Sequence, residues 1–160
     1  MRHGSRPFAV LILLASPALA APDVTTLVNA NAPKPAYADV SVTVTGLRSD
    51  HGVLRACLTP DPDDFPHCRH DSTSVRIVAA AAAEVHLVFV GVKPGRYAVA
   101  LLHDENNNGR MDRALMMMPR EGFGFSRDAP VRMGPPTFDR AAFELDVTGT
   151  AKMIRMRYML

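Results

Sequence analysis

The sequence predicts an all-β fold, an antiparallel β-sandwich of about seven strands that is immunoglobulin-like or transthyretin-like and has one long loop. Short runs in which apolar and polar residues alternate recur along the chain, which is the pattern of half-buried strands. Gly and Pro separate these runs, and no segment shows the apolar period of an amphipathic helix. The stretch from 103 to 136 lacks strand periodicity and predicts the long loop.

Residues 1–20 have the pattern of a signal peptide. Arg2 and Arg6 give a basic start, residues 8–15 are apolar, and residues 18–20 (Ala-Leu-Ala) have the small-x-small pattern of a cleavage site. Cleavage is expected after Ala20, and no later segment has the roughly 20 apolar residues that span a bilayer. The sequence therefore predicts a mature protein that is periplasmic or secreted and does not span the membrane.

The mature chain is predicted to be one domain behind a flexible leader. Residues 21–37 contain three prolines and no apolar period, and residues 38–160 have the length of a single β-sandwich domain. The net charge of the 160-residue chain is +2, and removing the two arginines of the signal peptide leaves 0. This balance argues against a nucleic-acid partner.

The predicted strands carry different burial patterns. In the first, Val40, Val42 and Val44 alternate with polar residues. The run at 96–102 is apolar on both faces, which is typical of a central strand. The alanines at 79–83 favour a helix by propensity alone, but their short run between two strands predicts a connection. The seven predicted strands are residues 39–45, 53–58, 74–78, 84–90, 96–102, 141–147 and 153–158.

Cys57 and Cys68 are the only cysteines, with ten residues between them. An exported protein meets an oxidising compartment, so we expect a disulfide, which stabilises a fold by about 2–3 kcal/mol for a loop of this size. The alternative is a thiolate metal site that includes His67 and His70.

The segment from Asp104 to Asp112 matches the first part of an EF-hand calcium loop. Oxygen-bearing side chains occupy loop positions 1, 3, 5 and 9, and Gly109 occupies position 6, where the chain must turn sharply. The predicted calcium ligands are the side chains of Asp104, Asn106, Asn108 and Asp112 and the backbone carbonyl of Arg110.

This loop lacks one EF-hand ligand. Position 12 is Leu115 instead of a bidentate Glu, so the calcium dissociation constant is expected to be on the order of 10⁻⁴–10⁻³ M. Glu121 would supply the missing carboxylate if the chain beyond Asp112 folds back. The alternative is that Asn-Asn-Asn-Gly is turn chemistry alone, because Asn and Gly tolerate positive φ.

The segment Gly122–Ser126 is predicted to anchor the long loop. Phe123 and Phe125 lie on one face if this segment is extended, and the glycines allow close backbone approach. Ser126 is not in the Gly-x-Ser-x-Gly context of a hydrolase nucleophile, so packing is the favoured interpretation.

Methionines are concentrated in the long loop. Met111, the run Met116–Met118 and Met133 share this stretch with His103, and thioethers with imidazole are copper ligands. The alternative is that methionine fills irregular apolar gaps. A third chemistry, hydrolysis with Asp104, Glu105 or Glu121 as acid or base, requires carboxylates that share one pocket.

The order and spacing of several motifs resemble a bacterial exported family called domain of unknown function 2141. The resemblance covers residues 39–158, and it implies an exported β-sandwich without an established activity. The motifs are Pro94-Gly95-Arg96-Tyr97, His103-Asp104-Glu105-Asn106, Asn108-Gly109, Asp112, Pro119, Glu121-Gly122-Phe123-Gly124-Phe125-Ser126 and Pro136-Thr137-Phe138.

The leading hypothesis is a non-enzymatic envelope domain that is structural or binds an envelope protein or ligand, with a weak calcium loop. No set of residues assembles a catalytic site, which is why this hypothesis leads. The alternatives are a periplasmic copper-handling protein that uses Met and His, and a carboxylate-dependent hydrolase.

Overall fold

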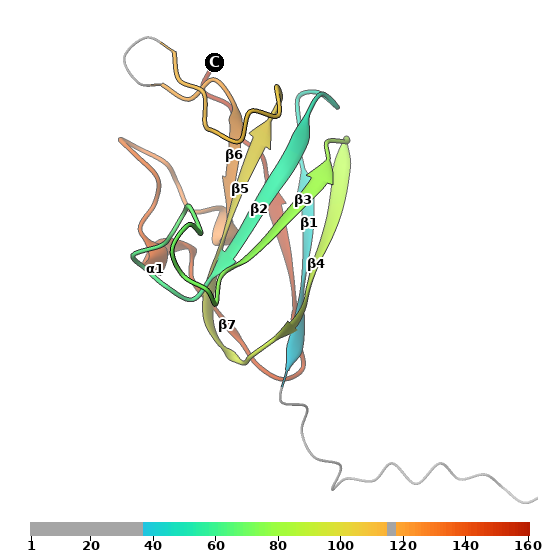
Figure 1. Cartoon of the computed structure of the whole chain (residues 1–160), viewed down its shortest axis with the longest axis vertical. Helices are drawn as coiled ribbons and strands as arrows, with labels where there is room; N and C mark the ends of the chain where they lie inside the picture. Colours follow the sequence, from blue (N-terminus) through green and yellow to red (C-terminus); the bar gives the residue numbers. More distant parts are fainter. Residues whose placement is uncertain (1–36, 115–117) are drawn as a thin grey trace, which may run out of the picture. The chain divides into compact units, whose positions relative to one another are not determined.

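Two β-sheets pack face to face in the computed structural model, which describes residues 37–114 and 118–160 (Figure 1). The predicted all-β sandwich is confirmed. The predicted signal peptide, nearly all of the leader and residues 115–117 lie outside the described ranges. The strands are β1 (Ala38–Thr45), β2 (Val53–Thr59), β3 (Val75–Ala80), β4 (Glu84–Val92), β5 (Gly95–Asp104), β6 (Gly122–Phe125), β7 (Phe143–Leu145) and β8 (Thr150–Arg155).

The smaller sheet has the strand order β4-β1-β8, and the larger sheet has the order β3-β2-β5-β6, with β7 also paired to β5. Strand β1 pairs antiparallel with β4 but parallel with β8, so that Val44 lies opposite Ile154. The pairs of the larger sheet are antiparallel, as predicted.

Three strand predictions near the C-terminus differ from the structure. Strand β6 was predicted only as an extended anchor, and the predicted strand 141–147 is a turn of helix α1 (Phe138–Ala141) followed by the short β7. Strand β8 begins and ends three residues before the predicted 153–158. After Met156, whose N–H donates to the carbonyl of Thr45 on β1, the chain crosses to β6, where the N–H of Arg157 donates to the carbonyl of Phe123 at 2.9 Å.

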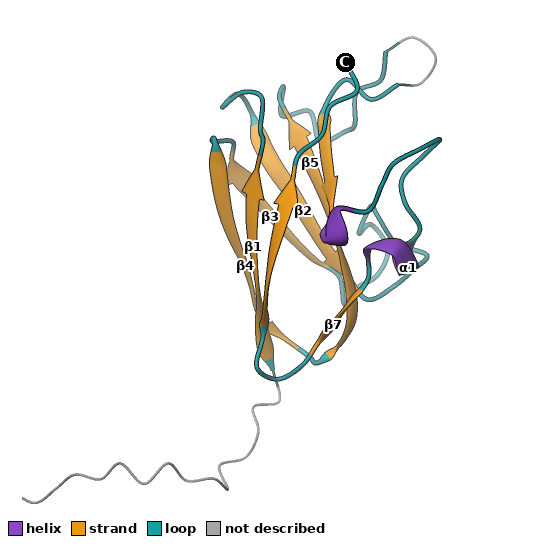
Figure 2. Ribbon diagram, turned by 180° about the vertical axis from the view of Figure 1, so that it is seen from behind, coloured by secondary structure: helices purple, strands orange, loops and turns teal. Residues whose placement is uncertain are grey.

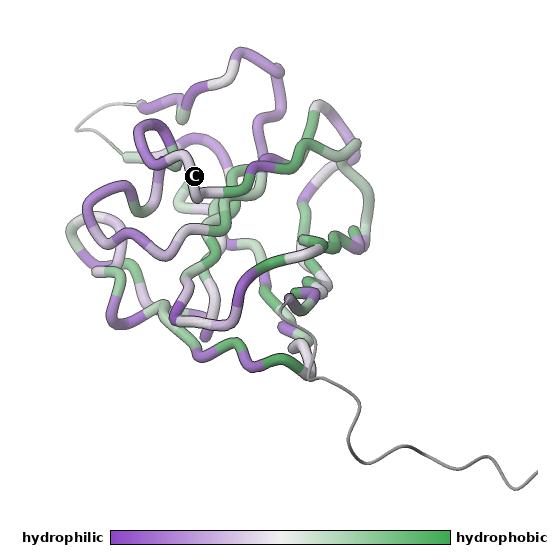
Figure 3. The backbone as a smooth tube through the Cα atoms, turned by 60° about the horizontal axis from the view of Figure 1, so that its bottom comes forward, coloured by the Kyte–Doolittle hydropathy of each residue, from purple (hydrophilic) through white to green (hydrophobic). Residues whose placement is uncertain are grey.

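The inner core lies between the two sheets. Val40, Val42 and Val44 are buried, as their alternation predicts, and they form one cluster with residues of the larger sheet such as Leu54 and Leu101. Figure 3 shows apolar and hydrophilic residues alternating along the strand that starts where the grey trace ends. Burial of one face of each strand is therefore what joins the sheets.

A second apolar cluster covers the outer face of the larger sheet. Strand β5 is buried on both faces, because Val99 belongs to the inner core and Ala98 and Ala100 belong to the outer cluster. The cover consists of residues 60–74, the short helix η2 (Ser126–Asp128) and α1, which lie on one side of the sheet in Figure 2. Among the described residues, no helix combines the length and apolar character needed to cross a bilayer.

Candidate functional site

Asp104 ends β5 and holds the loop that follows. Its carboxylate is fully buried, and it accepts the N–H of Asn108 at 3.0 Å and the N–H of Gly109 at 2.8 Å. Arg55 on β2 donates its Nε–H to the same carboxylate at 2.6 Å. Burial alone would raise the pKa of Asp104, but these hydrogen bonds outweigh burial and lower the pKa below its usual value. Asp104 is therefore a buried anion at the base of the loop.

The other predicted ligands turn toward one another. The side-chain amides of Asn106 and Asn108 donate to the two carboxylate oxygens of Asp112 at 2.7 and 3.0 Å. The Oδ1 atoms of the same two residues accept the N–H groups of Asn108 and Arg110, which are the short turns expected of asparagine. Gly109 has φ +78°, the left-handed conformation that glycine adopts without strain.

Glu121 reaches this loop from the far end of the following segment. Its side chain is 3% exposed, and its two oxygens accept the N–H of Glu105 at 3.2 Å and the N–H of Asp112 at 3.1 Å. Burial raises the pKa of Glu121, and the negative charges of Asp104 and Asp112 raise it further. Glu121 thus lies beside the loop, which is the position that the sequence analysis required of a fifth side-chain ligand.

The structure therefore brings Asp104, Asn106, Asn108, Asp112 and Glu121 to one loop. For Arg110, the sixth predicted residue, the N–H is bound within the loop, and the residue lines a neighbouring cavity. Within the described residues, no three side chains of His, Cys, Asp or Glu form a metal-binding group. The predicted calcium site also uses asparagine side chains and a backbone carbonyl, which are not among these four residue types, so calcium binding stays a prediction.

Glu105 is engaged by a different arginine. The guanidinium of Arg48 contacts the Glu105 carboxylate with Nη2 at 2.5 Å and Nε at 3.1 Å, and the hydroxyl of Ser49 donates to it at 2.8 Å. The hydrogen bond from Arg48 lowers the pKa of Glu105, although burial opposes the shift. Of the three carboxylates considered for hydrolysis, Asp104 and Glu105 pair with arginines and Glu121 is bound to backbone N–H groups.

His103 is not available as a copper ligand in this structure. It is fully buried, its Nδ1 lies 2.7 Å from the Tyr158 hydroxyl, and its Nε2 lies 2.9 Å from the carbonyl of His51. Ser126 is also satisfied internally, because its hydroxyl accepts the N–H of Val99 at 2.9 Å and donates to the carbonyl of Ala141 at 2.6 Å. The packing role predicted for Ser126 matches these contacts.

The predicted disulfide joins Cys57 on β2 to Cys68 in the segment 60–74. Asp64 organises the same segment: it is 4% exposed, and one of its oxygens accepts the N–H groups of Arg69 and His70 at 2.7 and 2.9 Å. Its other oxygen accepts the N–H of Asp71 at 3.2 Å. The segment is therefore fixed to the sheet by a covalent bond and a buried carboxylate.

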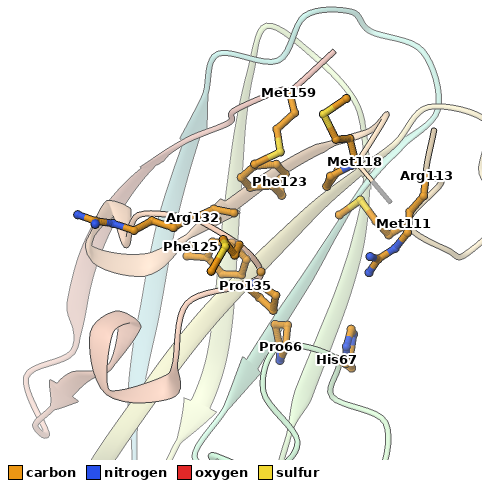
Figure 4. A pocket seen from close by; sticks show the side chains of 14 residues that line it. Pro66, His67, Met111, Arg113, Met118, Phe123, Phe125, Arg132, Pro135 and Met159 are labelled. Carbon is orange, nitrogen blue, oxygen red and sulfur yellow. The ribbon is translucent and has the colours of Figure 1, made fainter. Parts of the chain in front are cut away.

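Two adjoining cavities hollow the outer face of the larger sheet, with volumes of about 340 Å³ and 300 Å³, and Figure 4 shows the first of them. They share one set of lining residues and together form what we call the outer groove. The shared residues are Pro66, His67, Met111, Phe123 and Phe125. The remaining apolar lining consists mainly of Met118, Pro119, Val131, Met133, Pro135 and Met159 in the first cavity and Ala56, Ile77, Val78, Ala100 and Leu101 in the second.

Arginines line both cavities, and no Asp or Glu is among the described residues that line either one. Arg55 is paired with Asp104. The other five are exposed, and none of them has an ion pair within residues 37–114 and 118–160. These are Arg113 and Arg132 in the first cavity and Arg69, Arg76 and Arg110 in the second.

The profile of the family described as "uncharacterized protein conserved in bacteria (DUF2141)" matches residues 42–153. The chain belongs to this family. The DUF2141 match runs from β1 to β8, so it includes the calcium-like loop, the disulfide and most of the groove lining. No protein with a curated description and no solved structure matches the chain.

Sequence reasoning missed Asp64 and the outer groove of this DUF2141 protein. Asp64 lies in a run of Asp and Pro that looks like an ordinary turn, and only its burial marks it. The five exposed groove arginines lie on β3 and in several loops. Only the fold brings them together, so no local sequence pattern identifies them.

Proposed function

We propose that this protein is an exported, non-enzymatic binding domain and that the outer groove is its ligand site. The observation that carries this proposal is the continuous apolar floor, formed by Met111, Phe123 and Phe125, which joins two cavities on one face of the sheet. Concave, mostly apolar sites of about 300–1,000 Å³ with a few polar groups are typical of small-molecule binding.

Export is supported by two independent features. The first twenty residues have the signal-peptide pattern, and the disulfide between Cys57 and Cys68 suits an oxidising compartment. A periplasmic or secreted location follows as part of the proposal.

A binding role fits the site better than catalysis or copper handling. The carboxylates considered for hydrolysis are engaged by arginines or backbone N–H groups and do not line the groove. For copper, the thioethers of Met118 and Met159 lie at one end of the first cavity and His67 lies at the other, as Figure 4 shows. Separated ligands of this kind describe an apolar lining better than a coordination sphere.

Replacing Met111 with lysine is expected to weaken binding of a neutral apolar probe, N-phenyl-1-naphthylamine, by about tenfold. Met111 lines both cavities, and a buried Met side chain contributes on the order of 1.5 kcal/mol of apolar contact. Fluorescence titration measures the affinity. The matched control is Met153→Lys on β8, where the side chain is 72% exposed on the other sheet. Absence of probe binding to the wild type, or equal binding by Met111→Lys, would contradict the proposal.

As part of this function, the Asp104–Asp112 loop binds calcium weakly. Support comes from the EF-hand-like spacing of the loop and from the unfavourable gathering of Asp104, Asp112 and Glu121, which a cation would relieve. The guanidinium of Arg55 already offsets part of the negative charge, which is a further reason for low affinity.

Calcium at ten times its dissociation constant is expected to stabilise the protein by about 1.4 kcal/mol, which raises Tm by about 3–6 °C. Thermal unfolding followed by circular dichroism measures the shift, and a chelator should reverse it. Asp112→Asn should abolish the response, whereas Asp139→Asn on α1, whose side chain is 77% exposed, should retain it. An unchanged Tm at millimolar calcium, or an equal response in Asp112→Asn, would count against the loop as a calcium site.

A further inference from the structure

The outer groove combines apolar surface with unbalanced positive charge. Five exposed arginines without ion pairs in the described ranges surround an apolar floor, and the described lining contributes no carboxylate. The mature chain as a whole is neutral by formal charge, so this excess is local. A ligand that complements the groove therefore carries both negative charge and apolar surface.

The positive charge is concentrated where the two cavities meet. His67 lines both cavities, with Arg69 beside it in the second and Arg113 in the first. Figure 4 shows the Arg113 side chain reaching beside Met111 toward His67. Burial lowers the pKa of His67, and the charges of Arg69 and Arg113 lower it further, against the opposing charge of Asp64. The cationic groups at this junction are therefore Arg69 and Arg113, and no carboxylate of the described residues lines the cavities beside them.

We infer that the outer groove binds a small anionic amphiphile, a single alkyl chain with one carboxylate or phosphate head. This inference rests on the groove being the ligand site, as proposed above. The head contacts Arg69 and Arg113, whose guanidinium groups suit the oxygens of either acid. The alkyl chain lies over Phe123 and Phe125 toward Met118 and Met159.

The groove is less suited to an extended acidic peptide. A peptide that adds to a sheet needs a free strand edge for its backbone hydrogen bonds. The outer edge of β6, the strand that carries Phe123 and Phe125, is bridged to Arg157, and β3, the strand at the other end of this sheet, lines only the second cavity. The cavity volumes of about 340 and 300 Å³ also suit a small molecule more than a membrane surface, which is flat on this scale.

Titration with ligands of equal chain length and different heads tests the inference. Decanoate, decyl phosphate, decanol and decyltrimethylammonium are compared below their micelle concentrations by displacement of N-phenyl-1-naphthylamine and by calorimetry. Decanoate or decyl phosphate is expected to bind at least tenfold more tightly than decanol and the cation, and comparison of the two acids identifies the preferred head. The double variant Arg69→Gln/Arg113→Gln should lose this preference, whereas Arg140→Gln on α1, outside the groove, should retain it.

The outcomes separate this inference from the proposed function. Equal binding of acid, alcohol and cation overturns the anionic ligand but leaves the groove as a binding site. A preference that survives in the double variant also overturns it, because the charge would then be recognised elsewhere. If no amphiphile and no probe binds, both proposals fail. Binding to anionic lipid vesicles or to an acidic peptide without binding of monomeric decanoate or decyl phosphate overturns the small-ligand inference.

Discussion

Replacing Asp104 with alanine is expected to lower the free energy of unfolding by about 3–4 kcal/mol. The change leaves the N–H groups of Asn108 and Gly109 without their acceptor and leaves Arg55 without its carboxylate. Because Asp104 is fully buried at the end of a central strand, water does not replace it readily. Urea unfolding followed by far-ultraviolet circular dichroism measures the loss.

The variant Asp104→Asn removes the negative charge of this side chain and keeps its size and shape. The pKa of Asp104 is held below its ordinary 3.8, so the stability that its charge contributes is complete above about pH 5 and is lost as pH falls through the folded-state pKa. The stability difference between the wild type and Asp104→Asn should therefore be constant above about pH 5 and shrink below it. A difference that grows on acidification would show that the charged form is not the stabilising one.

Replacing Asp64 with alanine is expected to cost about 2–4 kcal/mol. Its carboxylate accepts three backbone N–H groups, from Arg69, His70 and Asp71, and it is the acceptor around which the segment 60–74 is arranged. Since Pro66 and His67 of this segment line the groove, the same change should also weaken binding of the neutral probe. Thermal unfolding and probe titration provide the two measurements.

The neighbouring residue provides the matched control for Asp64. Asp63 is exposed, and its side chain makes no hydrogen bond within the described residues, so Asp63→Ala is expected to change stability by less than about 0.5 kcal/mol. Equal losses in the two variants would mean that local charge, and not the buried acceptor, stabilises the segment.

The parts of the fold that the sequence predicts well are those set by local burial. The alternation of Val40, Val42 and Val44 identifies β1 and its buried face, and the apolar run of β5 identifies a strand that is covered on both sides. The parallel pairing of β1 with β8 is set by packing between the two ends of the domain, and no local pattern contains it.

Strand β6 shows why the sequence did not reveal every strand. The two glycines of its Gly-Phe-Gly-Phe sequence lower its strand propensity, and its pairing to β5 and the bridge to Arg157 hold it extended. The glycines are required by the C-terminal segment that crosses them: a Cβ at Gly122 would lie 2.4 Å from the Tyr158 ring, and one at Gly124 would lie 2.9 Å from Ile154. Close approach of a distant segment is a tertiary constraint that propensity does not include.

The candidate functional site was also predictable only in part from the sequence. The spacing of Asp104, Asn106, Asn108 and Asp112 identified a loop whose side chains do turn toward one another, because an Asx-rich turn fixes its own geometry. The outer groove was not predictable, because its floor comes from β6 and its arginines come from distant parts of the chain.

The disulfide links the outer groove to the redox state of the compartment. Cys68 directly follows Pro66 and His67, so the bond to Cys57 ties one wall of the groove to β2. In a reducing compartment this wall has no covalent tether to the sheet. The tethered form of the groove therefore exists only where thiols are oxidised, and protein for ligand measurements should be produced under oxidising conditions.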